Sequence, residues 1–233
     1  MNEEIRVSRA AEFYSIESEF DQELILYRFK TLQKLLVGSS CLELGPGSGV
    51  MTKLLSQHFD TLTVVEGSQQ LIDELLDLVN MEKVCSLFEE YETDKKFDSI
   101  VIEHVIEHVD NPREILARTK KWLSPNGRVY VGVPNANSIH RQAAVHMSLL
   151  DKTTDLNQRD LDFGHRRVYD KDSLAIEIKA AGLVPHEFRG VFLKPLSNGQ
   201  INENWSKDMW DGFYKLGDDY PDLCAEILFV CGD

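Results

Sequence analysis

Three glycines and a glutamate near residue 45 are spaced for ligand binding. Glu43 is followed by glycine at every second position, at Gly45, Gly47 and Gly49. Glycine lets the backbone turn tightly and approach a ligand without a Cβ atom in the way. The N–H groups that begin a following helix are unpaired and face such a loop. The pattern predicts a binding loop between a strand and a helix.

A second acidic residue extends this predicted site. Glu66 lies 21 residues beyond Gly45, where a carboxylate can accept hydrogen bonds from vicinal ribose hydroxyls. Glu43, an acceptor only when ionised, can bind loop N–H groups or a ligand ammonium. A dinucleotide fingerprint would need glycine where the chain has Val50, and a P-loop would need Gly-Lys-Ser/Thr. We therefore expect a site for a ribose and a cation, without an extended pyrophosphate.

Strands and helices alternate along the chain around this loop. Apolar residues at helical spacing predict helices over 21–37, 50–58, 69–79, 112–123, 172–181 and 205–216. Short apolar or β-branched runs predict strands over 41–44, 61–65, 84–87, 98–102, 128–133, 183–189 and 224–231. This alternation requires a parallel sheet with helices on both faces, and the last helix and strand can supply an antiparallel edge.

Residues 135–171 do not fit the alternation, because they are polar and weakly periodic. Connections of this length within a compact domain are usually functional. We expect short helices that form a lid over the carboxyl edge of the sheet. The segment is also not acidic, in contrast to the chain as a whole, since residues 137–171 hold six Lys and Arg against five Asp and Glu, with three histidines.

Composition excludes several classes of protein. The 233 residues include 25 Lys and Arg against 39 Asp and Glu, a formal net charge of −14. This acidity argues against a protein that neutralises nucleic-acid phosphates or docks tightly on an anionic membrane. The chain has no apolar run of about 20 residues and no secretory pattern at its start. Its four cysteines are interpreted as reduced core residues, and a cytoplasmic location is expected.

Four segments together resemble the class I S-adenosylmethionine-dependent methyltransferases: CLELGPGSG at 41–49, VVEGS at 64–68, FDSIVIEHVIEHV at 97–109 and LSPNGRVYVGVPN at 123–135. The EHV run and the VPN strand end are similar to the branch with ubiquinone-type O-methyltransferases and small-molecule or sugar methyltransferases. The resemblance implies a Rossmann-like, seven-stranded sheet whose last strand is antiparallel. It also implies S-adenosylmethionine as cofactor and S-adenosylhomocysteine as product.

The same resemblance implies one methyltransferase domain over residues 1–233. Its expected parts are an N-terminal helical cover (1–37), a cofactor-binding core (38–134), the lid insertion (135–171) and the C-terminal half of the sheet (172–233).

The resemblance also implies roles for individual residues. Glu43, Gly45, Gly47 and Gly49 match the loop around the methionine part of the cofactor, and Glu66 matches the ribose-binding acid with Gly67 and Ser68 beside it. Phe88 and Glu89 match the positions that flank the adenine, and Glu103 and His104 match the position that faces the sulfonium. Tyr14 belongs to a segment that commonly covers the pocket in this fold, so we expect it to line the cofactor site.

Methyl transfer to oxygen or nitrogen is an in-line displacement, in which the protein aligns the reactants and excludes water. A hydroxyl acceptor also needs a base, and His104 and His165 are the candidates. His108 is interpreted as a packed histidine. No metal is expected, although Glu103, His104, Glu107 and His108 are residue types that bind metals.

The expected acceptor is a small molecule, and Asn135, Arg141 and Arg166 are candidates to contact it. If the acceptor is anionic, Arg141, Arg166 or Arg167 can meet its charge. The acidic balance predicts no nucleic-acid partner and no membrane, and either a monomer or a homodimer is expected. Two alternatives stay open: an NAD-dependent oxidoreductase on a similar sheet, and a non-catalytic relative that only binds S-adenosylmethionine.

Overall fold

The computed structural model describes residues 18–233, so Tyr14 lies outside the described residues. Within them, seven strands form one mixed sheet in the order β3-β2-β1-β4-β5-β7-β6. The strands are β1 (Ser40–Leu44), β2 (Thr61–Glu66), β3 (Met81–Cys85), β4 (Phe97–Glu103), β5 (Leu123–Pro134), β6 (Val184–Val191) and β7 (Glu226–Gly232). Strands β1 to β5 pair in parallel, whereas β7 is antiparallel to both β5 and β6. The predicted fold class is confirmed, except that the antiparallel β7 lies between β5 and β6, so that β6 and not the last strand forms that edge of the sheet.

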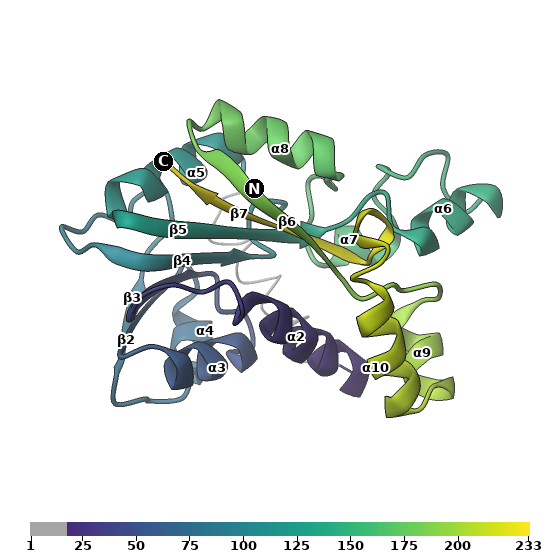
Figure 1. Ribbon diagram of the computed structural model, residues 1–233, viewed down its shortest axis with the longest axis horizontal. Coiled ribbons are helices and arrows are strands. Elements are labelled where there is room, and N and C mark those ends of the chain that lie inside the picture. The colour runs from purple at the N-terminus through teal and green to yellow at the C-terminus, as the bar shows by residue number, and fades with distance from the viewer. Residues whose placement is uncertain (1–17) are drawn as a thin grey trace.

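Helices cover both faces of the sheet (Figure 1). One face is packed by α2 (Glu19–Leu32), α3 (Val50–His58) and α4 (Gln69–Glu74), and the other by α5 (Pro112–Trp122) and α8 (Lys171–Ala180). The remaining helices are α6 (Ile139–His146), α7 (Gln158–Asp162), α9 (Asn198–Asn204), α10 (Lys207–Leu216) and the 3₁₀ turn η1 (Pro221–Leu223). A third apolar cluster joins α2 to α9 and α10, with Phe20, Tyr27, Phe192 and Trp210 at its centre. In the described residues, no helix has the length and apolar character needed to cross a bilayer.

Capping side chains set helix boundaries that apolar spacing alone did not find. Ser18 and Asp21 form a capping box that begins α2 at Glu19. The predicted helix over 205–216 starts too early, because Ser206 caps α10 and Trp205 is the extended residue that follows the separate, unpredicted helix α9. The predicted helix over 69–79 is also too long, since the chain is already extended at Leu75.

The cysteines divide by their place in the sheet. All four thiols are free, and Cys41, Cys224 and Cys231 are buried as predicted. The prediction was wrong for Cys85, which is exposed. Cys85 ends β3, and β3 is an edge strand of the sheet, so one of its sides has no neighbouring strand to cover it.

Trp122 offers a test of the core between the sheet and α5. Its indole is fully buried against the ring of Tyr91, with the ring centroids 5.1 Å apart. Trp122→Ala is expected to lower the free energy of unfolding by ~3–5 kcal/mol, because it removes a large buried side chain and leaves a cavity. Urea denaturation measures the change. The exposed Ile176→Ala on α8 is the control and should change stability by less than ~0.5 kcal/mol.

Candidate active site

The glycine loop connects β1 to α3 and is held at the carboxyl edge of the sheet. Gly45, Gly47 and Gly49 all have positive φ angles, of 71°, 51° and 77°, which glycine adopts without steric cost. The Gly45 N–H donates to the Val65 carbonyl at 3.0 Å. A Cβ atom at Gly45 would lie 2.6 Å from a methyl group of Val105. The alternating glycines are therefore required by the backbone itself, as the sequence predicts.

A cavity of about 230 Å³ opens beside this loop and joins segments far apart in the sequence. The loop residues Glu43 to Ser48 form one wall. The facing walls are rich in charged and polar side chains, namely Asp21, Arg28, Glu103, His104, His108, Asn135, His140, Arg141, Asn157, Arg159, Asp160, His165, Lys194, Asn198 and Glu226. Cavities with convergent polar groups of this kind are the usual places for ligands.

Glu43 carries an unpaired oxygen at the loop. Its side chain is buried, and its Oε2 atom has no hydrogen-bond partner among residues 18–233. Burial raises the pKa of Glu43 to about 7, and the nearby Thr52 hydroxyl opposes this shift. Buried carboxylates are normally paired. The residues present therefore fit a ligand that brings an ammonium or N–H donor to this position.

The predicted ribose and adenine residues lie on the neighbouring strand ends, outside the cavity lining. Glu66 is buried and its Oε1 atom accepts from the Ser68 N–H at 2.8 Å, while burial raises its pKa. Glu66, Gly67 and Ser68 thus form one compact turn at the end of β2. Phe88 lies beside the loop, with its ring 3.6 Å from the point where a Gly45 Cβ would stand. Glu89 follows Phe88 directly in the turn after β3 and is half-buried.

Glu103 and His104 end β4 beside the cavity. Burial raises the pKa of Glu103 to about 8, although the Arg28 guanidinium 4.0 Å away opposes the shift. His104 has a φ of 56°, the left-handed region that non-glycine residues rarely adopt, and its N–H donates to the Gly132 carbonyl at 2.9 Å. Its Nε2 lies 3.3 Å from Glu226 and its Nδ1 3.6 Å from Glu107. His104 is therefore held between two carboxylates, in a backbone conformation of the kind found at functional sites.

The raised pKa of Glu103 predicts a pH dependence of stability. Because folding favours the neutral carboxyl, its contribution is complete below the ordinary pKa of 4.5 and is lost as the pH rises through about 8. Glu103→Gln should therefore gain at least ~1 kcal/mol of stability relative to the parent protein at pH 9, and much less at pH 5. Urea denaturation at both pH values measures the difference. The exposed Glu203→Gln should show no such pH trend.

His165 and His108 meet edge to face at another wall of the cavity. The His165 Nδ1 lies 3.1 Å from Asp160, and the two imidazole centroids are 4.8 Å apart. Burial, with His165 and His104 nearby, lowers the pKa of His108 to about 3, so its ring is neutral. Glu107, His108 and His165 also present ligand atoms within 4.8 Å of one another. The expectation of no metal stays a prediction.

The arginines and the asparagine expected to contact acceptor all have contacts within the protein. Arg141, on α6, lines the cavity but bonds Asp160 at 3.0 Å and the carbonyls of Thr153 and Asp155. Arg166 pairs with Asp110, and Arg167 donates to the Val109 carbonyl at 2.8 Å. The Asn135 amide donates to the carbonyls of Asp222 and Cys224. Of these four, Arg141 and Asn135 line the cavity, whereas Arg166 and Arg167 do not.

Several polar residues of the cavity were missed from the sequence: Asp21, Arg28, His140, Arg159, Lys194, Asn198 and Glu226. Arg28 and Glu226 form an ion pair at 2.8 Å, and the Arg28, His104 and Lys194 charges outweigh burial and lower the pKa of Glu226 to about 2. A signal did exist for two of them, because Glu226 begins an otherwise apolar strand and Lys194 follows the apolar run Val191 to Leu193. For the other five residues, neither the side-chain type nor the spacing along the sequence indicates a place in the cavity.

Comparison with known protein families assigns the chain. A family model described as "Methyltransferase domain" matches residues 17–187, nearly three quarters of the chain. The chain belongs to this methyltransferase family. The methyltransferase uses S-adenosylmethionine as its cofactor, which the unpaired Glu43 oxygen and the glycine loop fit.

Individual relatives of the methyltransferase are distant. A ubiquinone biosynthesis O-methyltransferase of Rickettsia bellii is 28% identical over 99 residues, which cover 40% of this chain and 41% of the relative. The chain thus matches less than half the length of that curated relative. The N-methyltransferase NodS of Bradyrhizobium japonicum, solved with S-adenosylhomocysteine, aligns with a TM-score of 0.58 at 16% identity, covering 92% of this chain and 88% of NodS. An S-adenosylmethionine-dependent methyltransferase of Mesorhizobium loti aligns at 0.64 and 12% identity, covering 88% and 97%.

Proposed function

We propose that the protein methylates an oxygen or nitrogen atom of a small-molecule acceptor that binds in the cavity. The observation that carries the proposal is the continuity of this cavity, whose walls are the glycine loop on one side and histidine, acidic and basic side chains on the other. A cavity volume of about 230 Å³ suits a small molecule. The O-methyltransferase and N-methyltransferase names of the relatives support either acceptor atom.

The cofactor side of the site is assigned to the predicted residues. Bound S-adenosylmethionine supplies an electrophilic methyl group on a good leaving group. We assign Glu43 to its ammonium, because the buried Oε2 has no other partner among the described residues. Gly45, Gly47 and Gly49 let the backbone approach the methionine part, and Glu66 with Gly67 and Ser68 is assigned to the ribose. Phe88, Glu89 and Glu103 keep their expected roles, and Tyr14 remains a prediction outside the described residues.

His104 is our candidate base for a hydroxyl acceptor. Its imidazole lines the cavity and lies between Glu226 and Glu107, and a nearby carboxylate stabilises an imidazolium that forms when a proton is taken up. His165 is the second candidate, with Asp160 as its carboxylate partner at 3.1 Å. An amine acceptor needs no such base if it arrives unprotonated. We propose that the helices α6 and α7 of residues 135–171 act as a lid that excludes water from the cavity.

The two alternative functions are not equally supported by the family assignment. Membership of the methyltransferase family leaves no support for an NAD-dependent oxidoreductase. A non-catalytic relative that binds the cofactor remains the competing proposal. The expected lack of nucleic-acid partners, the cytoplasmic location and the monomer or homodimer stay predictions, as does the division at residues 37, 134 and 171.

Calorimetry with S-adenosylhomocysteine followed by a turnover screen tests the proposed function. The purified protein should bind the product, and should release S-adenosylhomocysteine when S-adenosylmethionine is incubated with pools of hydroxylated and amine metabolites. Binding without turnover on any pool would support the non-catalytic alternative. Absence of heat with either form of the cofactor would contradict both proposals.

A further inference from the structure

The cationic side chains that line the cavity differ in whether they form an ion pair with a carboxylate. Within the described residues, three of the four lysine and arginine side chains that line it have a carboxylate partner: Arg28 with Glu226 at 2.8 Å, Arg141 with Asp160 at 3.0 Å, and Arg159 with Asp21 at 2.9 Å. The fourth, Lys194, has no carboxylate oxygen within 4.0 Å among residues 18–233. Among the described residues, Lys194 is thus the one cation of this set whose charge no ion pair compensates.

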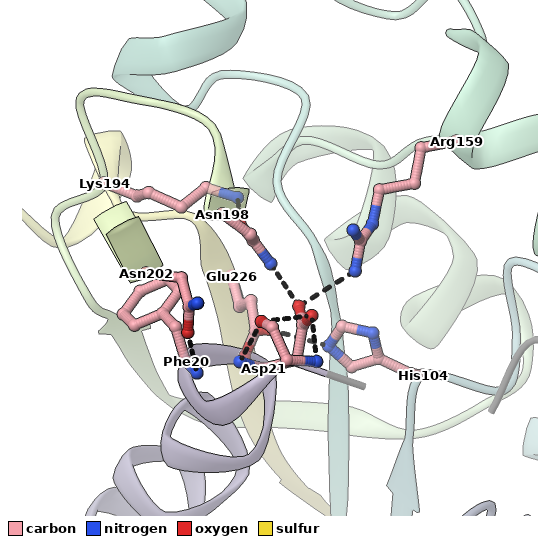
Figure 2. Close-up of polar contacts among 9 residues, drawn as sticks. Phe20, Asp21, His104, Arg159, Lys194, Asn198, Asn202 and Glu226 are labelled. Atoms are coloured by element: carbon pink, nitrogen blue, oxygen red, sulfur yellow. Dashed lines mark hydrogen bonds and ion pairs between the residues drawn. The ribbon is translucent and has the colours of Figure 1, made fainter. Parts of the chain in front are cut away.

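Lys194 is held in place by a neutral amide. Its Nζ donates to the Asn198 Oδ1 at 2.6 Å, and the Asn198 amide nitrogen donates in turn to Asp21 at 2.5 Å. Figure 2 shows Asn198 and Arg159 both reaching Asp21, with Lys194 attached to this group through Asn198. Since Arg159 already neutralises Asp21, the relay orients the ammonium without cancelling its charge.

Packing around Lys194 fixes the position of its backbone. The residue follows β6 directly after the buried Phe192 and Leu193, and the Leu193 N–H donates to the Phe213 carbonyl at 3.1 Å. Burial lowers the pKa of Lys194 to about 8, while the Glu226 carboxylate opposes the shift. The neighbouring His140 is neutral, because burial and the Lys194 and Arg141 charges lower its pKa to about 2. A desolvated cation of this kind gains free energy from an anion brought to it.

We infer that Lys194 binds a carboxylate or phosphate group of the methyl acceptor, which makes the acceptor an anion; this inference rests on the proposed function. The three arginines considered from the sequence have their guanidinium groups engaged with the chain. Lys194 instead faces the same cavity as His104, and Glu226 lies beside both. If the charged group of the acceptor binds Lys194, the rest of the acceptor lies in the same cavity as the candidate base His104.

Equilibrium binding to the protein saturated with S-adenosylhomocysteine tests the inference without any turnover. The probes are glucuronate, glucose 6-phosphate and the neutral glucuronamide, which share a hydroxylated ring and differ in charge. Wild-type protein should bind at least one anionic probe about tenfold or more tightly than glucuronamide, because a hydrogen bond between charged groups typically contributes that much to affinity. Lys194→Met should remove that preference, and Lys194→Arg should keep most of it. The exposed Lys207→Met on α10 is the matched control and should leave the preference unchanged.

The outcomes separate the two proposals. A preference for the phosphate over the carboxylate probe, or the reverse, identifies which anionic group the subsite takes. Equal affinity for charged and neutral probes, no binding of either anion at millimolar concentration, or a preference that survives Lys194→Met would each overturn the inference. Failure of the proposed function shows differently, as absence of S-adenosylhomocysteine binding or of turnover. Circular dichroism of each variant checks that the fold is retained.

Discussion

Gly47→Arg is expected to abolish measurable binding of S-adenosylhomocysteine, a loss of at least about a hundredfold in affinity. Gly47 lines the cavity and has a φ of 51°. An arginine there places a long side chain in the space proposed for the methionine part of the cofactor, in a backbone region that costs ~1–2 kcal/mol for residues with a Cβ. Calorimetric titration with the product measures the affinity.

A second glycine variant separates the effect of backbone strain from the effect of a side chain that blocks the cofactor space. Gly182 also has a positive φ, of 80°, but follows α8, and it is exposed and outside the cavity lining. Gly182→Arg should lower stability by a similar amount and leave product affinity within about twofold of wild type. If Gly47→Arg binds product normally, the glycine loop is not the cofactor site.

His104→Asn should reduce the turnover rate on a hydroxyl acceptor by ~10²–10⁴-fold, the usual contribution of a positioned acid–base group. Asparagine tolerates the left-handed backbone at this position better than other residues do, so the fold should be retained. The affinity for S-adenosylhomocysteine should stay within a few-fold of wild type. Steady-state kinetics with the acceptor found in the turnover screen, together with calorimetry, measures both.

The pH profile distinguishes a base from a structural residue at His104. Wild-type kcat should rise with pH through the titration of the base, and this rise should be lost in His104→Asn. The exposed His58→Asn at the end of α3 is the matched control and should leave rate and profile unchanged. An unchanged rate in His104→Asn would leave His165 as the candidate, or would indicate an amine acceptor that needs no base.

The alternation of elements and the glycine loop were predictable because their causes are local. The positive φ angles at Gly45, Gly47 and Gly49 need glycine in any fold, so residue type marks the loop directly. Glu66 could be placed because it ends a β-branched run at a set distance from the loop. The alternation of strand and helix periods also predicted a parallel sheet, whereas the seven strands with an antiparallel β7 were what the family resemblance implied.

Predictions weakened wherever a boundary depended on one side chain. α9 has a single apolar residue, Ile201, so apolar spacing does not reveal it; its start and the start of α10 depend on the caps Ser197 and Ser206. Cys85 was misplaced because the sequence of β3 does not reveal that the strand lies at the sheet edge.

The fold class, the family and the glycine loop could be predicted from the sequence, because each depends on residues that are neighbours along the chain. The charged wall that faces this loop across the cavity, in contrast, is formed by tertiary contacts. Arg28 from α2 meets Glu226 from β7, and His104 from β4 lies against the same carboxylate. Pairing of this kind also decided which cations are committed within the protein, as Arg141 is to Asp160, and left Lys194 to face the cavity. Charge pairing depends on distances in space, and the spacing of residues along the chain does not contain them.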